Sequence, residues 1–101
     1  MRKIIKYRNR KMYDATVDHC YITGARLLYL HFIKKETFTV VERETGMNIT
    51  RGVITKEFLK LCSRFPEELY RFTDQDASFS QDFYDYLTFA GKTVKPEDEP
   101  G

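Results

Sequence analysis

The segment 24–34, Gly-Ala-Arg-Leu-Leu-Tyr-Leu-His-Phe-Ile-Lys, constrains the fold most, because its apolar side chains cannot share one face of a helix. Thr23 precedes it and is a suitable N-cap, so we expect a helix here. A helix that is apolar nearly all round must be covered on two sides. Either the rest of the same domain or a second copy of the chain has to supply that cover.

Stretches rich in β-branched and aromatic residues predict short antiparallel strands. We expect residues 3–7 and 11–13 to pair across a turn at residues 8–10, where an asparagine tolerates the left-handed region. Residues 37–50 are expected to form a second β-hairpin, with Gly46 in its turn.

A second helix is predicted over residues 53–64, because its apolar residues recur at helical spacing and form a single stripe. Two further helices are expected over residues 66–72 and 79–90. Ser78 begins a capping box for the last of these, and Gly91 is expected just beyond its end. The sequence therefore predicts a small α+β domain, with short antiparallel strands packed by two helices and a helical C-terminal extension.

The charge of the chain is divided along its length. Residues 1–64 hold 14 Lys and Arg against 6 Asp and Glu, whereas residues 65–101 hold 3 against 9. We expect a basic domain over residues 1–64, a helical extension over 65–91 and a disordered acidic tail over 92–101. A basic domain favours a polyanionic partner, although solvated charges without a partner remain the alternative.

No arrangement of residues typical of an enzyme occurs in the chain. There is no serine–histidine–acid pattern and no glycine-rich phosphate loop. His19 and Cys20 form a reactive-looking pair, but no base is placed to orient the imidazole. Zinc ligation by His19, Cys20, His31 and Cys62 would need a spacing that matches no common zinc module. We therefore expect no enzymatic activity, no cofactor and no metal.

Two features bear on the compartment. Cys20 and Cys62 are too few and too far apart for a disulfide framework, which favours a reducing environment. No apolar run approaches the roughly 20 residues that a membrane-spanning helix needs. We expect a cytoplasmic protein without a membrane span.

The N-terminal segment is the most informative about function. Its first eleven residues hold six cations, interleaved with apolar residues, and no acid precedes Asp14. A two-stranded ribbon can enter the major groove of DNA, where arginine reads guanine and asparagine reads adenine. The alternative is that the cations have no ligand and only protect a solvent-exposed edge strand against aggregation. The residues expected to contact nucleic acid at the turn are Lys6, Arg8, Asn9, Arg10 and Lys11.

A second group of cations is expected to hold phosphate near the start of the 53–64 helix, whose partial positive charge adds to theirs. This group consists of Arg51, Lys56 and Lys60. Structural roles are expected for other residues of the opening segment. Tyr7 and Tyr13 would pack as cross-strand partners, and Asp14 would cap the chain or pair with Arg10.

Three motifs in this order resemble the polyhydroxyalkanoate (polyhydroxybutyrate) accumulation regulators. Residues 4–14, IIKYRNRKMYD, are similar to the family's opening I-K-K-Y-x-N-R-[RK]-L-Y-D. Residues 21–23 resemble its Y-[IV]-T, and residues 38–51, FTVVERETGMNITR, resemble its F-x-V-V-D-A-K-T-G-E-D-[IL]-T-R. The likeness covers about residues 3–62 and is absent beyond residue 65. One departure is Ile5, which stands where the family usually has lysine.

The resemblance implies a bacterial transcriptional regulator, usually a repressor, whose N-terminal domain binds promoter DNA. It also implies that double-stranded DNA, the polyhydroxyalkanoate polymer and further copies of the chain are the partners. The residues that match the opening and last motifs by position are Lys6, Asn9, Arg10, Lys11, Tyr13, Asp14, Thr50 and Arg51.

An alternative function comes from another class of protein. The apolar 24–34 helix and the acidic extension favour a regulator-like domain used for protein–protein interaction or for binding a signalling nucleotide, without DNA binding.

Overall fold

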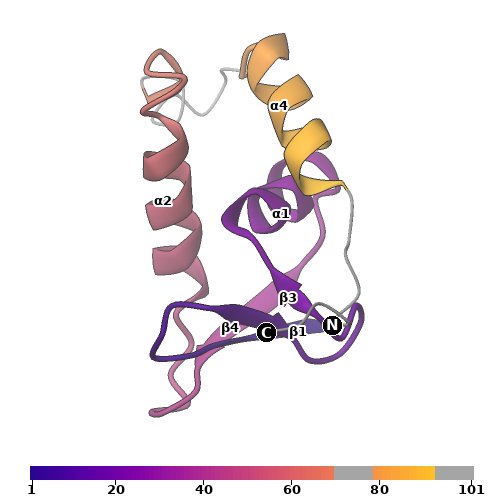
Figure 1. Ribbon diagram of the computed structural model, residues 1–101, viewed down its shortest axis with the longest axis vertical. Helices are drawn as coiled ribbons and strands as arrows, with labels where there is room; N and C mark the ends of the chain where they lie inside the picture. Colours follow the sequence, from indigo (N-terminus) through magenta and orange to yellow (C-terminus); the bar gives the residue numbers. More distant parts are fainter. Residues whose placement is uncertain (70–78, 93–101) are drawn as a thin grey trace.

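A four-stranded sheet forms the base of the molecule, and the helices stand on one side of it (Figure 1). The computed structural model describes residues 1–69 and 79–92. The strand order is β3-β2-β1-β4, so the first strand lies inside the sheet and the last strand lies at one edge. The strands are β1 (Arg2–Lys6), β2 (Met12–Asp14), β3 (Tyr21–Ile22) and β4 (Phe38–Glu42).

The sheet is mixed, which corrects the prediction of purely antiparallel strands. β1 pairs antiparallel with β2, as expected, with Ile5 opposite Tyr13. β1 also pairs with β4, and this pairing is parallel, with Ile5 beside Val41. A parallel pair needs a long crossover, and here β2, β3 and the first helices supply it. The α+β class itself is confirmed.

The predicted hairpin over residues 37–50 is only partly formed. Its returning strand is reduced to a single bridge between Val41 and Asn48. A helix begins soon after this bridge, because the backbone groups of Val40 form hydrogen bonds with Ile49 and Thr50 at the start of the helix. The Val40 N–H donates to the Thr50 hydroxyl at 2.8 Å, and the Val40 carbonyl accepts from the Ile49 N–H at 2.8 Å. The helix α2 accordingly spans Thr50–Leu61 and begins three residues earlier than predicted.

The predicted helix over residues 24–34 forms in two parts. The α-helix α1 spans Gly24–Leu28, and a π-helical turn, η1, continues it over Tyr29–Ile33. Thr23 caps α1 as expected, because its hydroxyl accepts from the Arg26 N–H at 3.1 Å. Four consecutive residues across the junction of the two parts, Leu27 to Leu30, are buried.

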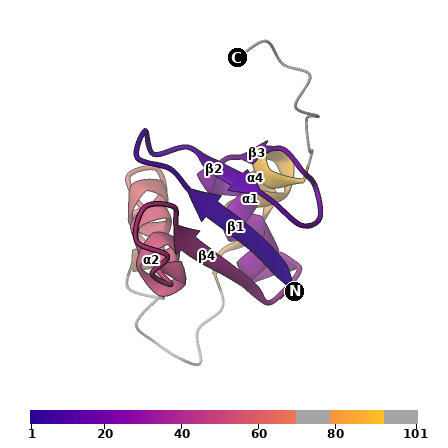
Figure 2. The ribbon, with the colours of Figure 1, turned by 90° about the horizontal axis from the view of Figure 1, so that it is seen from below.

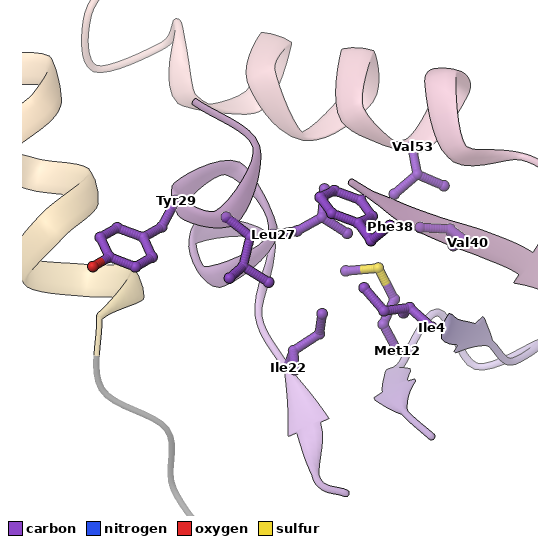
Figure 3. Packing of buried hydrophobic residues seen from close by; sticks show 9 residues of the cluster. Ile4, Met12, Ile22, Leu27, Tyr29, Phe38, Val40 and Val53 are labelled. Carbon is purple, nitrogen blue, oxygen red and sulfur yellow. The ribbon is translucent and has the colours of Figure 1, made fainter. Parts of the chain in front are cut away.

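The same domain covers α1 and η1 on both sides, which settles the alternative that the sequence left open. Toward the sheet, Leu27 and Leu30 pack with Ile4 and Val40 (Figure 3). On the other side, Leu28 belongs to a second cluster that α2 and the C-terminal helix α4 supply. The buried members of that cluster are Leu28, Phe58, Leu61, Cys62, Phe83 and Leu87.

Helix α4 spans Gln81–Gly91, and its ends differ from the prediction. Ser80 is the N-cap, since its hydroxyl accepts from the Phe83 N–H at 3.2 Å, whereas Ser78 lies outside the described residues. Gly91 belongs to the helix and is buried. Of the helix predicted over residues 66–72, the structure describes only the first four residues, and of the tail predicted over 92–101 it describes only the first.

Candidate nucleic-acid interface

The turn between β1 and β2 is held by its own backbone. The Tyr7 N–H donates to the Lys11 carbonyl and the Arg10 N–H donates to the Tyr7 carbonyl, both at 2.9 Å. The Asn9 side-chain oxygen accepts from the Lys11 N–H at 3.1 Å. The left-handed residue is Arg10, with φ +72°, and not Asn9 as predicted. Asn9 therefore serves the turn with the same oxygen that could otherwise have met a ligand.

The turn presents its cations in two different states. Asn9, Arg10 and Lys11 are exposed. Arg8 is 85% exposed, but its guanidinium makes two hydrogen bonds to the Glu44 carboxylate, at 2.8 and 2.6 Å. The charge of Arg8 is thus compensated within the chain, which the sequence did not indicate. A phosphate would have to compete with Glu44 for this side chain.

Lys6 links the turn to helix α2. It lies at the end of β1 on the side of the sheet that carries the helices, because its neighbours in register are buried Met12 and the end of β4. Burial lowers the pKa of Lys6, and the nearby charges of Lys56, Lys60 and Arg10 lower it further, while Glu57 opposes them. Figure 2 shows the β1–β2 turn beside α2. The two groups of cations predicted from the sequence therefore meet.

We call Lys6, Arg10, Lys56 and Lys60 the cationic face. Lys56 and Lys60 are exposed and lie one helical turn apart on α2. Lys60 makes an ion pair with Glu57 at 3.3 Å, which leaves the face with a net positive charge. Four cations gathered from two distant segments of the chain form a local field that favours polyanions.

Arg51 is exposed in the first turn of α2, apart from this face. A separation of five residues turns it by about 140° around the helix from Lys56. The structure therefore does not group Arg51 with Lys56 and Lys60, although the sequence analysis placed all three at one site.

Arg2, one of the six N-terminal cations, is not available to a ligand. Its side chain is buried and makes ion pairs with Asp14, Asp18 and Glu36. Hydrogen bonding to Glu36 raises the pKa of Arg2 against the effect of burial, and Asp14 adds to the rise. Of the two roles expected for Asp14, pairing with Arg10 is wrong, since Arg2 is the partner, and capping is confirmed, since Asp14 accepts from the Thr16 and Val17 N–H groups.

Asp14 is fully buried and well satisfied. Burial by itself would raise the pKa of this carboxyl, but N–H groups of Val17 and Thr16 donate to it, and with Arg2 they hold its pKa below the ordinary value. This residue of the opening motif thus organises the loop after β2. Its role in the described structure is in the fold.

The tyrosines of the opening motif are arranged differently from the prediction. Tyr13 packs edge-on against Tyr21, with ring centroids 5.3 Å apart, and not against Tyr7. The Arg43 guanidinium lies 5.9 Å from the centroid of the Tyr7 ring, and the Lys11 ammonium lies 5.4 Å from that of Tyr21. The sequence analysis did not single out Arg43 and Tyr21 as surface residues. The alternation of inward and outward side chains along the predicted strands could have identified them.

Two other kinds of site are absent from the described part of the chain. In residues 1–69 and 79–92, no group of three or more His, Cys, Asp or Glu side chains could hold a metal ion. Within the same ranges, no helix has the length and apolar character needed to cross a membrane.

A small α+β domain with a cationic face fits a nucleic-acid-binding module, and comparison with known families gives the class. A family model described as the PHB/PHA accumulation regulator DNA-binding domain matches residues 3–63. The match covers more than half of the 101 residues, so the chain belongs to this family of DNA-binding regulatory domains. The resemblance seen in the three motifs is confirmed. No curated protein and no solved structure matches the chain.

Proposed function

We propose that the chain is a transcriptional repressor that binds double-stranded DNA through the cationic face. The observation that carries the proposal is the meeting of the β1–β2 turn with helix α2, which joins Lys6 and Arg10 to Lys56 and Lys60. Asn9 and Lys11 extend the same turn and are exposed. We assign Arg10 to a base edge and the lysines to phosphates, because arginine suits bidentate contacts and lysine suits point contacts.

The mutual repulsion of these cations supports a polyanionic ligand. Each of the charges of Lys56, Lys60 and Arg10 disfavours the protonated form of Lys6. Phosphate oxygens placed among them would remove that repulsion and release condensed counterions from the DNA. Binding of this kind weakens steeply as the salt concentration rises.

The double variant Lys56→Gln/Lys60→Gln tests the proposal. It is expected to weaken binding to duplex DNA and to reduce the salt slope by about two, because two phosphate contacts are lost. The matched control is Lys34→Gln/Lys35→Gln, which changes the net charge equally at two exposed positions outside the cationic face. A titration across a salt series in which both double variants behave alike would refute the assignment.

Glu44→Gln supplies a change in the opposite direction. Removing this carboxylate charge frees Arg8 for phosphate, so binding to duplex DNA is expected to tighten and the salt slope to steepen. Glu67→Gln, at an exposed position beyond α2, is the control for net charge. If Glu44→Gln and Glu67→Gln change duplex binding equally, the change is a general effect of net charge and Arg8 has no role in binding.

The proposal also includes partners other than DNA. We propose that the protein acts as a homo-oligomer, because repressors commonly place two copies on two half-sites. Sedimentation of the full chain with and without duplex DNA measures this state. Binding to polyhydroxyalkanoate, which the family name suggests, is measured by co-sedimentation with polymer granules.

A further inference from the structure

The sheet has a second face, which points away from the helices. We call it the outer face and define it by the outward-pointing strand residues Lys3, Ile5, Tyr13, Tyr21, Thr39 and Val41. The alternate strand positions, such as Ile4 and Val40, are fully buried against the helices, which fixes this orientation. Figure 2 looks onto the outer face from below. In the described part of the chain, no helix or strand covers it.

A row of aromatic and aliphatic side chains crosses the outer face from edge to edge. The pairing register places Tyr21 beside Tyr13, Tyr13 beside Ile5, and Ile5 beside Val41. The Tyr21 side chain is 46% exposed, and the other three are partly exposed. A continuous row of this kind across all four strands is unusual for a surface that meets only water.

Cations flank the row of side chains on the outer face. Lys3 lies on the outer face itself, Lys11 approaches the Tyr21 ring, and Arg43 approaches the ring of Tyr7 beyond the end of β1. None of the outward-pointing positions in the four described strands is acidic. A second copy stacked on this face would bring like charges together without acids to balance them, which is unfavourable.

The row of rings and the cations beside it together indicate the chemistry of the partner. Aromatic rings on a four-stranded sheet can stack unpaired bases, and neighbouring cations can hold the phosphates between them. A closed duplex offers its bases only at their edges, so it cannot stack them on tyrosine rings in this way. The cations of this face disfavour a basic surface as its partner, and together with the rings they favour an anionic partner that carries flat, apolar rings.

We infer that the outer face binds single-stranded nucleic acid, with Tyr13 and Tyr21 stacking on bases and Lys3, Lys11 and Arg43 contacting the backbone. This surface lies on the other side of the sheet from the cationic face, and Lys11 at the β1–β2 turn is the one residue that both assignments use. It therefore gives the protein a second activity beyond duplex binding.

The test uses the full 101-residue chain and a mixed-sequence single strand of about 12 nucleotides, within the range of known site sizes. The variant Tyr13→Leu/Tyr21→Leu keeps apolar side chains on the sheet but removes the rings. It is expected to weaken single-strand binding by about tenfold or more and to leave duplex affinity within about twofold. Phe89→Leu, which changes an exposed aromatic residue on α4, is the control and should change neither affinity.

A spectroscopic measurement reports stacking directly. The chain has seven tyrosines and no tryptophan, so its intrinsic fluorescence comes from tyrosine. Single-strand binding is expected to quench this emission in the wild type and in Phe89→Leu, but much less in the double tyrosine variant. Circular dichroism of both variants establishes that the fold is retained.

Three results would overturn the inference. The first is a wild-type chain that does not bind the single strand. The second is an equal loss of single-strand and duplex binding in the tyrosine variant, which would make the outer face the duplex surface. The third is a wild-type oligomer that the tyrosine variant converts to monomers, which would show that a second copy covers the face. Failure of Lys56→Gln/Lys60→Gln to affect duplex binding bears only on the cationic face.

Discussion

Arg10 occupies a backbone conformation that glycine adopts at lower energy. At φ +72° its Cβ crowds the backbone, which costs about 1–2 kcal/mol for an ordinary residue. A glycine in its place would relieve that strain but would lose about 0.5–1 kcal/mol through the greater freedom of the unfolded chain. The turn therefore tolerates an arginine that its geometry does not favour, as functional sites often do.

Arg10→Gly separates folding from binding. We expect the free energy of unfolding to stay the same or rise by up to about 1.5 kcal/mol, because the strain is relieved. Binding to duplex DNA is expected to weaken by about 1–3 kcal/mol, because the base contact is lost. Urea unfolding and a DNA titration of the same preparation measure the two effects. A variant that is less stable but binds DNA as well as the wild type would contradict both expectations.

Asp14 carries the clearest prediction about pH. Asp14→Asn is expected to lower the free energy of unfolding at pH 7 by about 3–5 kcal/mol, because Arg2 is left buried without its innermost partner. The folded pKa of Asp14 lies below the ordinary value, so its contribution is present above about pH 4 and is lost as the pH falls through the folded pKa. The stabilities of the two proteins should therefore converge in acid.

Urea unfolding from pH 7 to pH 3 measures this convergence. Asp85→Asn, on the exposed side of α4, is the control and should keep the wild-type pH profile. A stability difference between Asp14→Asn and the wild type that stays constant over this range would exclude ionised Asp14 as its source.

At the residue scale, the sequence allowed the exposed cations to be predicted but not the buried one. Arg2 and Lys3 are adjacent and chemically alike, yet Arg2 points to the helix side and Lys3 points outward. The three acids that hold Arg2 come from positions 14, 18 and 36, so only the folded chain brings them together. The same holds for Arg8 and Glu44, which are 36 positions apart.

At the scale of elements, periodicity located the helices and strands but not their exact form. The apolar 24–34 segment had to be covered on two sides, and the structure confirms this with two clusters. The sequence analysis expected one continuous helix here and did not anticipate the change to a π-turn at Tyr29. The parallel pairing of β1 with β4 depends on the crossover and not on either strand's own sequence.

Two helical glycines give opposite predictions. A Cβ at Gly91 would lie 2.5 Å from the Tyr29 Cβ and 2.6 Å from the Ala25 carbonyl oxygen, so Gly91→Ala is expected to destabilise the protein by about 1–3 kcal/mol. A Cβ at Gly52 meets nothing within 4 Å, so Gly52→Ala in α2 is expected to stabilise it by about 0.4–1 kcal/mol. Thermal or urea unfolding measures both effects, and a Gly91→Ala variant as stable as the wild type would contradict the close approach of α4 to α1 and η1.

The C-terminal end of α4 is also held by hydrogen bonds. Arg26, from α1, donates to the carbonyls of Gly91 and Lys92 at 2.9 and 3.1 Å. The same side chain pairs with Asp18, which in turn pairs with Arg2. Strand β1 and helix α4 are thereby connected through one chain of charged groups.

At the scale of the whole molecule, the matched family segment does not contain the complete core. The family model ends at residue 63, whereas Phe83 and Leu87 of α4 are fully buried in the cluster that covers Leu28 and Phe58. The change of charge near residue 65 predicts a domain boundary there. Hydrophobic packing crosses that position, since burial depends on apolar contact and not on the sign of surface charge.

Phe83→Ala tests whether α4 and the sheet unfold as one unit. Because Phe83 is fully buried among Phe32, Phe58, Phe65 and Phe79, its truncation is expected to cost about 3–5 kcal/mol. If the unit is single, this loss appears equally in the hydrogen exchange of sheet amides such as Asp14 N–H, which is bonded to the Cys20 carbonyl at 2.9 Å.

The control lies on the same helix. Phe89 is 83% exposed, so Phe89→Ala should change the stability by no more than about 0.5 kcal/mol. Phe83→Leu, a milder change, gives a measurable loss even if the alanine variant does not fold. If only the α4 amides exchange faster in the Phe83 variants, and the sheet amides exchange as in the wild type, then α4 opens independently of the sheet. In that case the DNA-binding part would fold without its extension, and the boundary near residue 65 would be a real one.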